Sequence, residues 1–419
     1  MRVLFSHPNH PAQFRRLAPH LANQGHDVVF IAERHEWHAP QGLPYRVLRA
    51  EPQRGGGGAS IHPYLRRFEQ AVLQGQATFR SCEQLQKDGW QPDVIINHVG
   101  FGNGLYLGDA FPRARRIGLF EWYYNAENSD VDFLNRGPVP ADRRLRLRGW
   151  NAQILLELAA VDQAVTPTQW QRSQFPAWIQ PRLQVIHEGI DLSAMAQLRQ
   201  PAPATRPFGL PNDPDVEVVT YLSRGFEEYR GFPQAIRALA LLQQRRPNVH
   251  LLLAGSDVVA YGSARHDGRS WRQWACDELD LDPQRTHWLG MLQEDQYHQL
   301  LACSQVHLYL SVPFVLSWSL LEAMAAGCSL VASATPPVQE VLRHGHSAVL
   351  VDFWDVEAQA QAMAALLDNP RRARDLATHA QQAAQAYGAD RGLSSWNRLV
   401  CGDTNQTARS ACAGQGNDL

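Results

Sequence analysis

The sequence lacks the features that would place the protein in a membrane or in a disulfide-stabilised class. No apolar run approaches the roughly 20 residues that a helix needs to cross a bilayer. The segment Met1–Pro8 has neither the apolar core nor the small-residue cleavage site of a signal peptide. The six cysteines show no Cys-x-x-Cys spacing. We therefore expect reduced thiols, no zinc site and a cytoplasmic location.

Neither sign of charge dominates the chain. The formal net charge is −2 at pH 7, and charged residues make up 19% of the 419 residues. Proteins that bind nucleic acids need a basic surface, so this balance argues against a nucleic-acid partner. Hydrophobic residues reach 44%, which is enough to fill the cores of two or three domains.

Strands and helices alternate along the chain, first from the N-terminus and again from about residue 185. In the first half, Arg2–Ser6, Asp27–Ala32 and Asp93–Asn97 are expected strands, and Pro11–Gln24 is an expected helix. In the second half, Glu217–Leu222 begins a similar series. This alternation predicts two doubly wound α/β domains with parallel sheets. Ligands of such sheets lie beyond the carboxyl ends of the strands, so we expect a cleft between two facing domains.

The segment from Phe314 to Gly327 carries the strongest signal for a ligand. Its polar turn Ser317–Ser319 opens a run of strong helix formers, and a helix N-terminus with small hydroxyls can bind an anion. Glu322 is a carboxylate inside this apolar helix, and carboxylates are rarely buried without a partner. These groups suit the diphosphate and the hydroxyls of a nucleotide-sugar. The alternative is a capped core helix with Glu322 on its solvent face.

In the first half, a histidine and a carboxylate each close a predicted strand. His98 follows Asp93–Asn97 and precedes a glycine-rich loop, and Glu121 ends the strand that starts at Arg116. Both side chains are expected at the carboxyl edge of the sheet. The aromatic residues after Glu121 suit the stacking of a sugar. The alternatives are a histidine that caps the next helix and an edge strand with half-buried aromatics.

Several short segments resemble the retaining glycosyltransferases of family 4, which have the GT-B fold. The resemblance covers roughly residues 1–400 and is strongest in the second half. The order and spacing of these segments carry it: Val185–Asp191, Ser223–Gly225, Tyr229–Phe232, Leu253–Gly255, Trp288–Gly290, Ser317–Gly327 and Pro337–Val341.

This resemblance implies two Rossmann-like domains: an acceptor-side domain, residues 1–182, and a nucleotide-sugar-binding domain, residues 183–385. In the family fold the chain end crosses back to the first domain, which implies a helix at 386–402 with Trp396 as an anchor. Residues 403–419 are polar without periodicity, so we expect a disordered tail.

The family holds the donor diphosphate with two basic residues, and the matching positions are Arg224 and Arg230. The second is usually Lys and lies one residue earlier. Negative charge develops as a nucleoside diphosphate departs, and a guanidinium can stabilise it with two hydrogen bonds. We expect no metal ion and no other cofactor.

The two signature glutamates of the family fall on Phe314 and Glu322. The resemblance implies that Glu322 binds the ribose of the nucleotide. Phe314 lacks the carboxylate that the family places near the donor sugar, and its ring is expected to pack against the sugar or close the site. The other expected donor-binding residues are Ser317, Trp318, Ser319 and Gly290.

The family places a histidine at the position of His98 that helps to bind the donor sugar. His98 therefore joins Arg224 and Arg230 as a catalytic candidate. After the first strand the family often has glycines, whereas this chain has polar residues. The expected acceptor-side residues are Asn9, His10, Gln13 and Glu121.

Two charged segments allow other interpretations. Asp130–Asp132 matches the pattern of a metal-binding DxD motif. It is expected in a loop of a fold that does not bind a metal through such a motif, so we expect no metal ligation. Arg143–Arg148 is the one basic cluster of the sequence. It is either a solvated helix start or a peripheral contact with anionic lipid headgroups or a diphosphate-linked acceptor.

The resemblance implies a retaining transfer of a sugar from a nucleotide-diphosphate sugar to a hydroxyl of a glycan, a lipid-linked or a small-molecule acceptor. In the family's front-face mechanism the acceptor attacks on the side that the diphosphate leaves, and the phosphate takes the proton. Two alternatives remain open. One is a non-transferase of the same fold, such as a nucleotide-sugar epimerase, and the other is a catalytically silent sugar-nucleotide-binding subunit. A cytoplasmic location, with contact at the inner face of the membrane, fits the basic cluster.

Overall fold

The computed structural model describes residues 1–35, 42–198 and 206–402. These residues divide into two compact units. The first unit contains residues 1–126, 139–189 and the chain from 389 onward, and the second contains 127–138 and 190–388. The expected tail at 403–419 lies outside the described residues, and the expected cleft between the domains stays a prediction.

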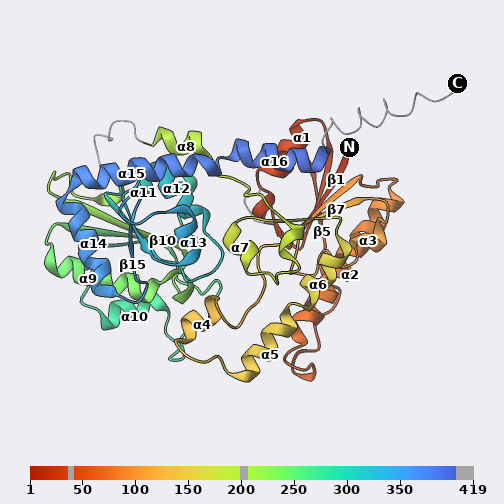
Figure 1. Ribbon diagram of the computed structural model, residues 1–419, viewed down its shortest axis with the longest axis horizontal. Helices are drawn as coiled ribbons and strands as arrows, with labels where there is room; N and C mark the ends of the chain where they lie inside the picture. Colours follow the sequence, from red (N-terminus) through yellow and green to blue (C-terminus); the bar gives the residue numbers. More distant parts are fainter. Residues whose placement is uncertain (36–41, 199–205, 403–419) are drawn as a thin grey trace. The chain divides into compact units, whose positions relative to one another are not determined.

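The first unit is built on a sheet of seven parallel strands in the order β5-β3-β1-β6-β7-β8-β9 (Figure 1). Parallel strands are covered on both faces, which explains why their sequences are rich in Val, Ile, Leu and Phe. The strands are β1 (Arg2–Ser6), β3 (Asp27–Ala32), β5 (Arg46–Arg49), β6 (Val94–His98), β7 (Arg115–Leu119), β8 (Gln163–Thr166) and β9 (Leu183–Val185). A separate pair is formed by β2 (Asn9–His10) and β4 (Arg34–His35).

Side chains that alternate along these strands build one core on each face of the sheet. Phe5 and Phe30 pack with α1 (Leu17–Asn23) and α16 (Ala389–Cys401), whereas Leu4 and Ile31 pack with α2 (Arg66–Lys87) and α3 (Leu107–Ala110). Trp396 of α16 is 2% exposed in the first of these cores. The helices are α1 (Leu17–Asn23), α2 (Arg66–Lys87), α3 (Leu107–Ala110), α5 (Ala141–Trp150), α6 (Ala152–Ala160), α7 (Gln169–Ser173) and α16 (Ala389–Cys401).

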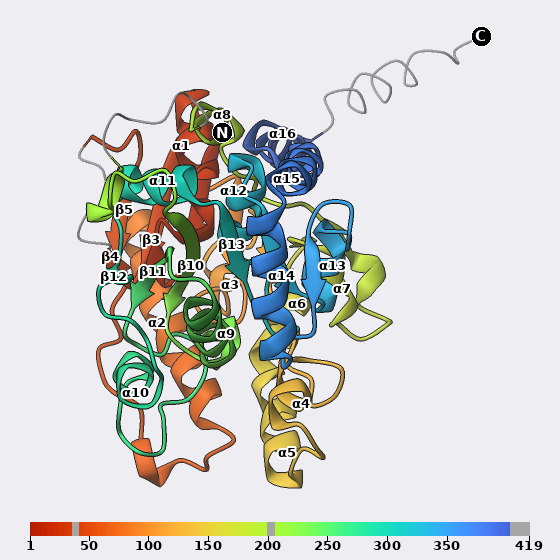
Figure 2. The ribbon, with the colours of Figure 1, turned by 90° about the vertical axis from the view of Figure 1, so that its left-hand side faces the viewer.

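The second unit is built on six parallel strands in the order β12-β11-β10-β13-β14-β15. They are β10 (Glu217–Gly225), β11 (Val249–Ser256), β12 (Thr286–Gly290), β13 (Val306–Tyr309), β14 (Leu330–Ser333) and β15 (Val349–Val351). One core contains α9 (Phe232–Arg245), α10 (Trp271–Glu278) and α14 (Val356–Asp368), which are labelled in Figure 2. The other contains α8 (Leu192–Gln197), α12 (Trp318–Ala326), α13 (Pro336–Val341) and α15 (Pro370–Ala384), with α11 (Glu294–Cys303) beside α12.

The unit boundaries differ from those expected at residues 182 and 385. The strand β9 pairs with β8, so Leu183–Val185 complete the first sheet and the second unit begins at Ile190. The segment 127–138, which contains α4 (Asp130–Asn135), belongs to the second unit. Its Phe133 ring packs on Phe353 and Trp354, with centroids 5.2 and 5.5 Å away.

Candidate active site

Parallel pairing brings three predicted side chains of the first unit to one edge of its sheet. The strand β6 lies between β1 and β7, and His98 is its last residue, whereas Glu121 follows β7 by two residues. The His98 Nε2 atom lies 3.3 Å from Glu121 Oε2. Gln13 donates through Nε2 to Glu121 Oε1 at 2.8 Å. These contacts join a histidine, a carboxylate and an amide where doubly wound sheets bind ligands.

Glu121 keeps its negative charge at neutral pH. Burial acts to raise the pKa of this carboxyl group, but the close contact with His98, the hydrogen bond from Gln13 and the nearby His187 outweigh it and lower the pKa. Its side chain is 20% exposed. A partly open carboxylate of this kind can accept a hydrogen bond from a substrate hydroxyl.

His7 belongs to the same cluster, although the sequence did not single it out. It follows β1 directly, is 3% exposed, and contacts His98 edge to face with ring centroids 4.8 Å apart. Its Nδ1 atom accepts from the backbone N–H of Asn9 at 2.9 Å. Burial, with a smaller effect of His98, holds the pKa of His7 well below its usual value. The position directly after a central strand was the available signal.

The other acceptor-side candidates lie elsewhere in this region. His10 is fully buried, its Nε2 atom lies 3.1 Å from the Tyr45 hydroxyl, and its ring packs against Phe30. A side chain inside the core cannot meet an acceptor, so the structure does not place His10 in the cluster. Asn9 is partly exposed and reaches the cluster through its backbone bond to His7.

Two residues of α6 hold the glycine loop that follows His98. Glu157 accepts from Asn97 Nδ2 at 2.8 Å and from the Gly100 N–H at 3.2 Å. Gln153, one turn earlier, donates to the Gly100 carbonyl at 3.1 Å. Burial raises the pKa of Glu157 to about 8. The sequence signal was a pair of polar residues four apart on an apolar helix.

The glycines of the loop after His98 allow its backbone to approach α6 and α2 closely. A Cβ atom at Gly104 would lie 2.1 Å from Glu157 Oε2, and one at Gly102 would lie 2.2 Å from the carbonyl oxygen of Ala71 on α2. Gly102 also has a φ of +91°, which favours glycine. The loop is therefore packed tightly between α6 and α2.

In the second unit, Arg230 is a buried guanidinium whose hydrogen-bond partners among the described residues are neutral groups. Arg230 is 8% exposed and donates through Nη1 to Ser311 Oγ at 2.8 Å, to the Val315 carbonyl at 3.1 Å and to the Tyr309 hydroxyl at 3.4 Å. Burial opposes its charged form, but the surrounding tyrosines and Glu227 outweigh this and raise its pKa. No carboxylate of the described residues lies at ion-pair distance from it. A buried charge of this kind is stabilised when an anion binds.

Arg224 lies at the carboxyl end of β10, one residue before its last residue, Gly225. Its side chain is exposed, and its carbonyl accepts from Ser256 Oγ at 2.7 Å. The two predicted diphosphate-binding arginines therefore differ in setting. Arg230 is fixed by the fold, whereas Arg224 can adjust to a ligand.

The N-terminus of α12 is joined to Arg230 through one hydroxyl. Tyr309 accepts from the backbone N–H of Ser317 at 3.4 Å and from Arg230 at the same distance. Ser317 caps the helix by accepting from the Ser319 N–H at 3.2 Å, and the two serine hydroxyls lie 2.6 Å apart. Trp318 is partly buried against the core of the unit. The positive end of the helix dipole and a buried cation therefore lie close together, and both favour the binding of an anion.

Glu322 and Gly290 come from neighbouring elements of the same unit. Glu322 on α12 is partly exposed and accepts from the hydroxyl of Tyr297 on α11 at 2.7 Å. Gly290 ends β12 with a φ of +66°, and a Cβ atom there would meet nothing within 4 Å. Tyr297 orients the carboxylate, a contact that the sequence motif did not reveal.

Phe314 stands in an aromatic group. Its ring centroid lies 5.2 Å from that of Tyr229 and 5.4 Å from that of Tyr261, and both contacts are edge to face. Neither tyrosine was expected in the site. Tyr261 lies 53 residues before Phe314 in the sequence, so no local pattern could connect them.

The Asp130–Asp132 motif lies at the start of a helix, whereas a loop was expected there. It opens α4, where Asp130 accepts from the Tyr229 hydroxyl at 2.5 Å and Asp132 accepts from the N–H of Ser129 at 2.9 Å. Both carboxylates are thereby engaged by the protein. Within the described ranges, no group of three or more His, Cys, Asp or Glu side chains could hold a metal ion.

The basic cluster Arg143–Arg148 forms part of α5, where most of its arginines are exposed. Arg146 pairs with Asp142 at 2.7 Å, and Asp142 also accepts from the Tyr64 hydroxyl. Leu145 is 56% exposed among these charges. No helix in the described part of the chain combines the length and the apolar character of a membrane span.

Two family models match the chain. The "Glycosyl transferase family 4 group" matches residues 24–195, and "Glycosyl transferases group 1" matches residues 205–383. Among curated proteins, the D-inositol 3-phosphate glycosyltransferase of Mycolicibacterium smegmatis is 29% identical over 224 residues, or 52% of this chain and 48% of the relative. The enzyme of the same name from Mycobacterium avium is 29% identical over 227 residues, or 52% of this chain and 50% of the relative. The chain spans about half the length of the curated relatives it matches.

Solved structures match over almost the whole chain. Sucrose-phosphate synthase from Thermosynechococcus elongatus superposes with a TM-score of 0.69 at 18% identity, covering 98% of this chain and 100% of its own. Anabaena HepE in complex with UDP-glucose superposes with a TM-score of 0.68 at 17% identity, covering 96% and 99%. At this identity the likeness shows the fold, which is GT-B with two Rossmann-like domains. Because the two family models together match most of its length, the chain belongs to the family 4, group 1 glycosyltransferases.

Proposed function

We propose that the protein transfers a sugar from a nucleotide-diphosphate sugar to an acceptor hydroxyl, with retention of the anomeric configuration. Family membership supports the reaction class, and family 4 enzymes are generally retaining. The curated relatives carry glycosyltransferase names, and one structural neighbour was solved with UDP-glucose.

Arg230 carries the proposal. Its guanidinium is buried without a carboxylate at ion-pair distance in the described chain, and the Tyr309 hydroxyl joins it to the N-terminus of α12. A diphosphate would satisfy both groups, and the leaving diphosphate has more charge to stabilise than the bound donor. Arg224 would add an adjustable second cation. Glu322, oriented by Tyr297, would accept from the hydroxyls of the ribose.

In the proposed reaction, an acceptor hydroxyl oxygen attacks the anomeric carbon on the face from which the diphosphate departs. The bond between this carbon and the phosphate oxygen breaks, the bond to the acceptor oxygen forms, and the acceptor proton passes to the departing phosphate. No protein group forms a covalent bond. The arginines stabilise the charge on the diphosphate, and we propose that they do so without a metal ion.

The cluster of His98, Glu121 and Gln13 in the first unit would bind the donor sugar and the acceptor. We propose that His98 binds the donor sugar, while Glu121 accepts from an acceptor hydroxyl with Gln13 holding its other oxygen. Phosphorylated polyols and sugars appear in the names of a relative and a structural neighbour, so a small phosphorylated acceptor is our first choice. A lipid-linked acceptor would instead use the exposed arginines of α5 at a membrane surface.

The test is a titration of the protein with UDP, GDP and ADP by calorimetry, followed by transfer assays with the matching glucose donors. Arg230→Ala and Glu322→Ala are expected to weaken the binding of the one preferred nucleotide. Arg371→Ala, which removes an exposed arginine of α15, serves as the control. Glycosylated product with retained anomeric configuration by NMR would support the proposal. Epimerised donor, or no binding of any nucleotide, would contradict it.

A further inference from the structure

A cavity of about 640 Å³ lies at the edge of the second sheet that is opposite to Arg230. Ser304 and Gln305 line this cavity directly before β13, whereas Ser311, which holds Arg230, follows the same strand. The cavity therefore lies at the amino ends of the parallel strands, and we call it the amino-edge cavity. Doubly wound sheets bind their usual ligands at the other edge, so the proposed function leaves this cavity without a role.

The helix α12 runs from the proposed diphosphate site to the amino-edge cavity. Its first turn holds Ser319, and its last residue, Ala326, lines the cavity. The 9 residues of α12 span about 14 Å, so a small ligand in the cavity would not touch a diphosphate bound at the helix N-terminus. The neighbouring helices α11 and α15 pack against α12 and supply other parts of the wall (Figure 1).

Most of the cavity wall is apolar. The helices α11, α14 and α15 contribute Leu301, Leu366 and Ala377, and β10 contributes Val218. Sites that bind small molecules have volumes in this range and are lined mainly by hydrophobic side chains. The wall can therefore cover the hydrocarbon part of a ligand and remove it from water.

Two arginines give the cavity a positive charge. Arg206 donates through Nη1 to the carbonyl of Val216 at 3.1 Å, and Arg374 lies near the start of α15. Burial raises the pKa of the Cys303 thiol in the cavity wall to about 12, and the charge of Arg206 is among the effects that act in the opposite direction. The guanidinium of Arg206 is therefore close to the wall. None of the described residues that line the cavity is Asp or Glu.

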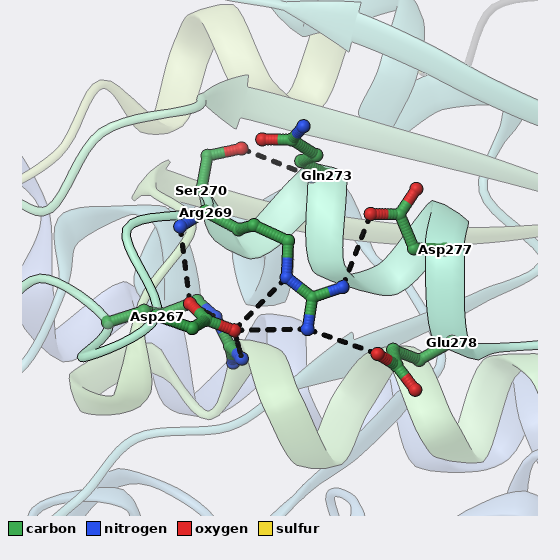
Figure 3. Close-up of polar contacts among 7 residues, drawn as sticks. Asp267, Arg269, Ser270, Gln273, Asp277 and Glu278 are labelled. Carbon is green, nitrogen blue, oxygen red and sulfur yellow. Dashed lines mark hydrogen bonds and ion pairs between the residues drawn. The ribbon is translucent and has the colours of Figure 1, made fainter.

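Several other arginines of the second unit have carboxylate partners. Arg269 lies between Asp267 and Glu278, at 3.0 Å from each (Figure 3). For Arg206 and Arg374, in contrast, the described part of the chain offers no carboxylate at ion-pair distance. Two cations beside an apolar cavity, without an acid to neutralise them, attract an anion.

A buried hydroxyl in the same wall also lacks a partner. Ser329 directly precedes β14, lines the cavity and is 4% exposed. Its Oγ atom has no hydrogen-bond partner among the described residues. Buried polar groups are almost always paired, and a polar group in the cavity would supply the missing partner.

We propose that the amino-edge cavity is a second binding site, whose ligand is a small amphipathic anion with a phosphate or carboxylate group on a hydrocarbon body. The anionic group pairs with Arg206 and Arg374, and the hydrocarbon body contacts the leucines of the wall. This inference goes beyond the proposed function and does not depend on it, because the two sites lie at opposite edges of the sheet.

The test is a calorimetric titration with octyl phosphate and with octanoate, at concentrations below those at which they form micelles. Octanol has the hydrocarbon body without the charge, and inorganic phosphate has the charge without the body. We expect at least one of the two amphipathic anions to bind with a dissociation constant below about 1 mM. We also expect it to bind about tenfold or more tightly than octanol and inorganic phosphate do.

Substitution of the two arginines locates the ligand. Arg374→Ala and Arg206→Ala should each weaken the binding of the better anion by about tenfold or more, because a hydrogen bond to a charged group is lost. Arg374 is exposed, so its replacement is not expected to disturb the fold. Arg371→Ala, at an exposed position of the same helix that does not line the cavity, is the control.

Three results would overturn the inference: neither anion binds below about 1 mM, octanol or inorganic phosphate binds as tightly, or both arginine variants bind the anion like the wild type. A competition experiment repeats the titration with the nucleoside diphosphate that binds best. We expect the dissociation constant of the anion to stay within about threefold. A constant that rises in proportion to the nucleotide concentration would place both ligands in one site, which overturns the inference and leaves the proposed function standing. If no nucleotide binds, the proposed function is wrong, and the arginine variants still decide the inference.

Discussion

The Nη1 atom of Arg230 donates to Ser311 Oγ at 2.8 Å, and this bond ties the cation of the second unit to the end of a central strand. Ser311 follows β13 by two residues and is fully buried. The guanidinium therefore depends on the sheet for its position. A cation that is fixed before the substrate binds needs no reorganisation when charge develops on a leaving diphosphate.

The first prediction concerns the charge and shape of Arg230. Arg230→Ala should lower kcat/KM by about 10²- to 10³-fold, because one preorganised partner of the leaving group is lost. Arg230→Lys should recover part of this loss, since it restores the charge without the planar fork. Steady-state kinetics with a saturating acceptor measures both, with Arg371→Ala as the control. Full activity of Arg230→Ala would show that Arg230 is not part of the active site.

The second prediction is that EDTA leaves the transfer rate unchanged. In the proposed reaction, Arg224, Arg230 and the N-terminus of α12 would together supply the positive charge for the diphosphate. A divalent cation would perform the same task, so it is not needed in the proposed reaction. The assay compares initial rates in EDTA with rates in added Mg²⁺ or Mn²⁺. A rate that falls in EDTA and returns with a metal would show that the arginines do not suffice.

The third prediction separates the acceptor side from the donor side. Glu121→Gln keeps the shape of the side chain and removes the charge that His98 and Gln13 hold. A hydrogen bond to a charged group contributes about 1.5–3 kcal/mol, so the KM of the acceptor should rise about tenfold or more. The affinity for the nucleotide should stay unchanged. Glu83→Gln on the exposed surface of α2 is the control, and a change confined to nucleotide affinity would contradict the assignment.

The strands were predictable because they are apolar runs between polar residues. The predicted bounds of Arg2–Ser6 and Asp27–Ala32 agree with β1 and β3. The helix predicted at Pro11–Gln24 was wrong in its first part, where Ala12 has a φ of +43° that no α-helix allows. A short 3₁₀ turn fills this part, and α1 begins at Leu17. Local periodicity cannot reveal such a break.

Some residues of the candidate site could be predicted from the sequence, and others could not. Arg230 and Glu322 lie in segments with a recognisable order of residues, so the sequence could single them out. The backbone N–H of Tyr261 donates to the side-chain carboxylate of Glu227 across 34 positions, and only the folded loop reveals this contact. His10 shows the opposite error, because a polar residue after a strand was expected to be open and is buried against Tyr45.

The last prediction uses the buried carboxyl group of Glu157. Its pKa is about 8 in the folded protein, whereas an exposed glutamate titrates near 4.5. Between these two values the folded state keeps a proton that the unfolded state has lost. The contribution of Glu157 to stability is therefore full below about pH 4.5 and falls as the pH rises through about 8. Each unit of this pKa difference corresponds to about 1.4 kcal/mol.

Glu157→Gln should remove this dependence, because glutamine does not ionise. The measurement is the free energy of unfolding from denaturant curves between pH 5 and 9, expressed as wild type minus variant, so that the contributions of the histidines cancel. This difference should decrease as the pH rises toward about 8 and then level off. Gln153→Ala also removes a contact to Gly100 and serves as the control, with a destabilisation that does not vary with pH. A difference between wild type and Glu157→Gln that stays constant would show that Glu157 is ionised in the folded protein.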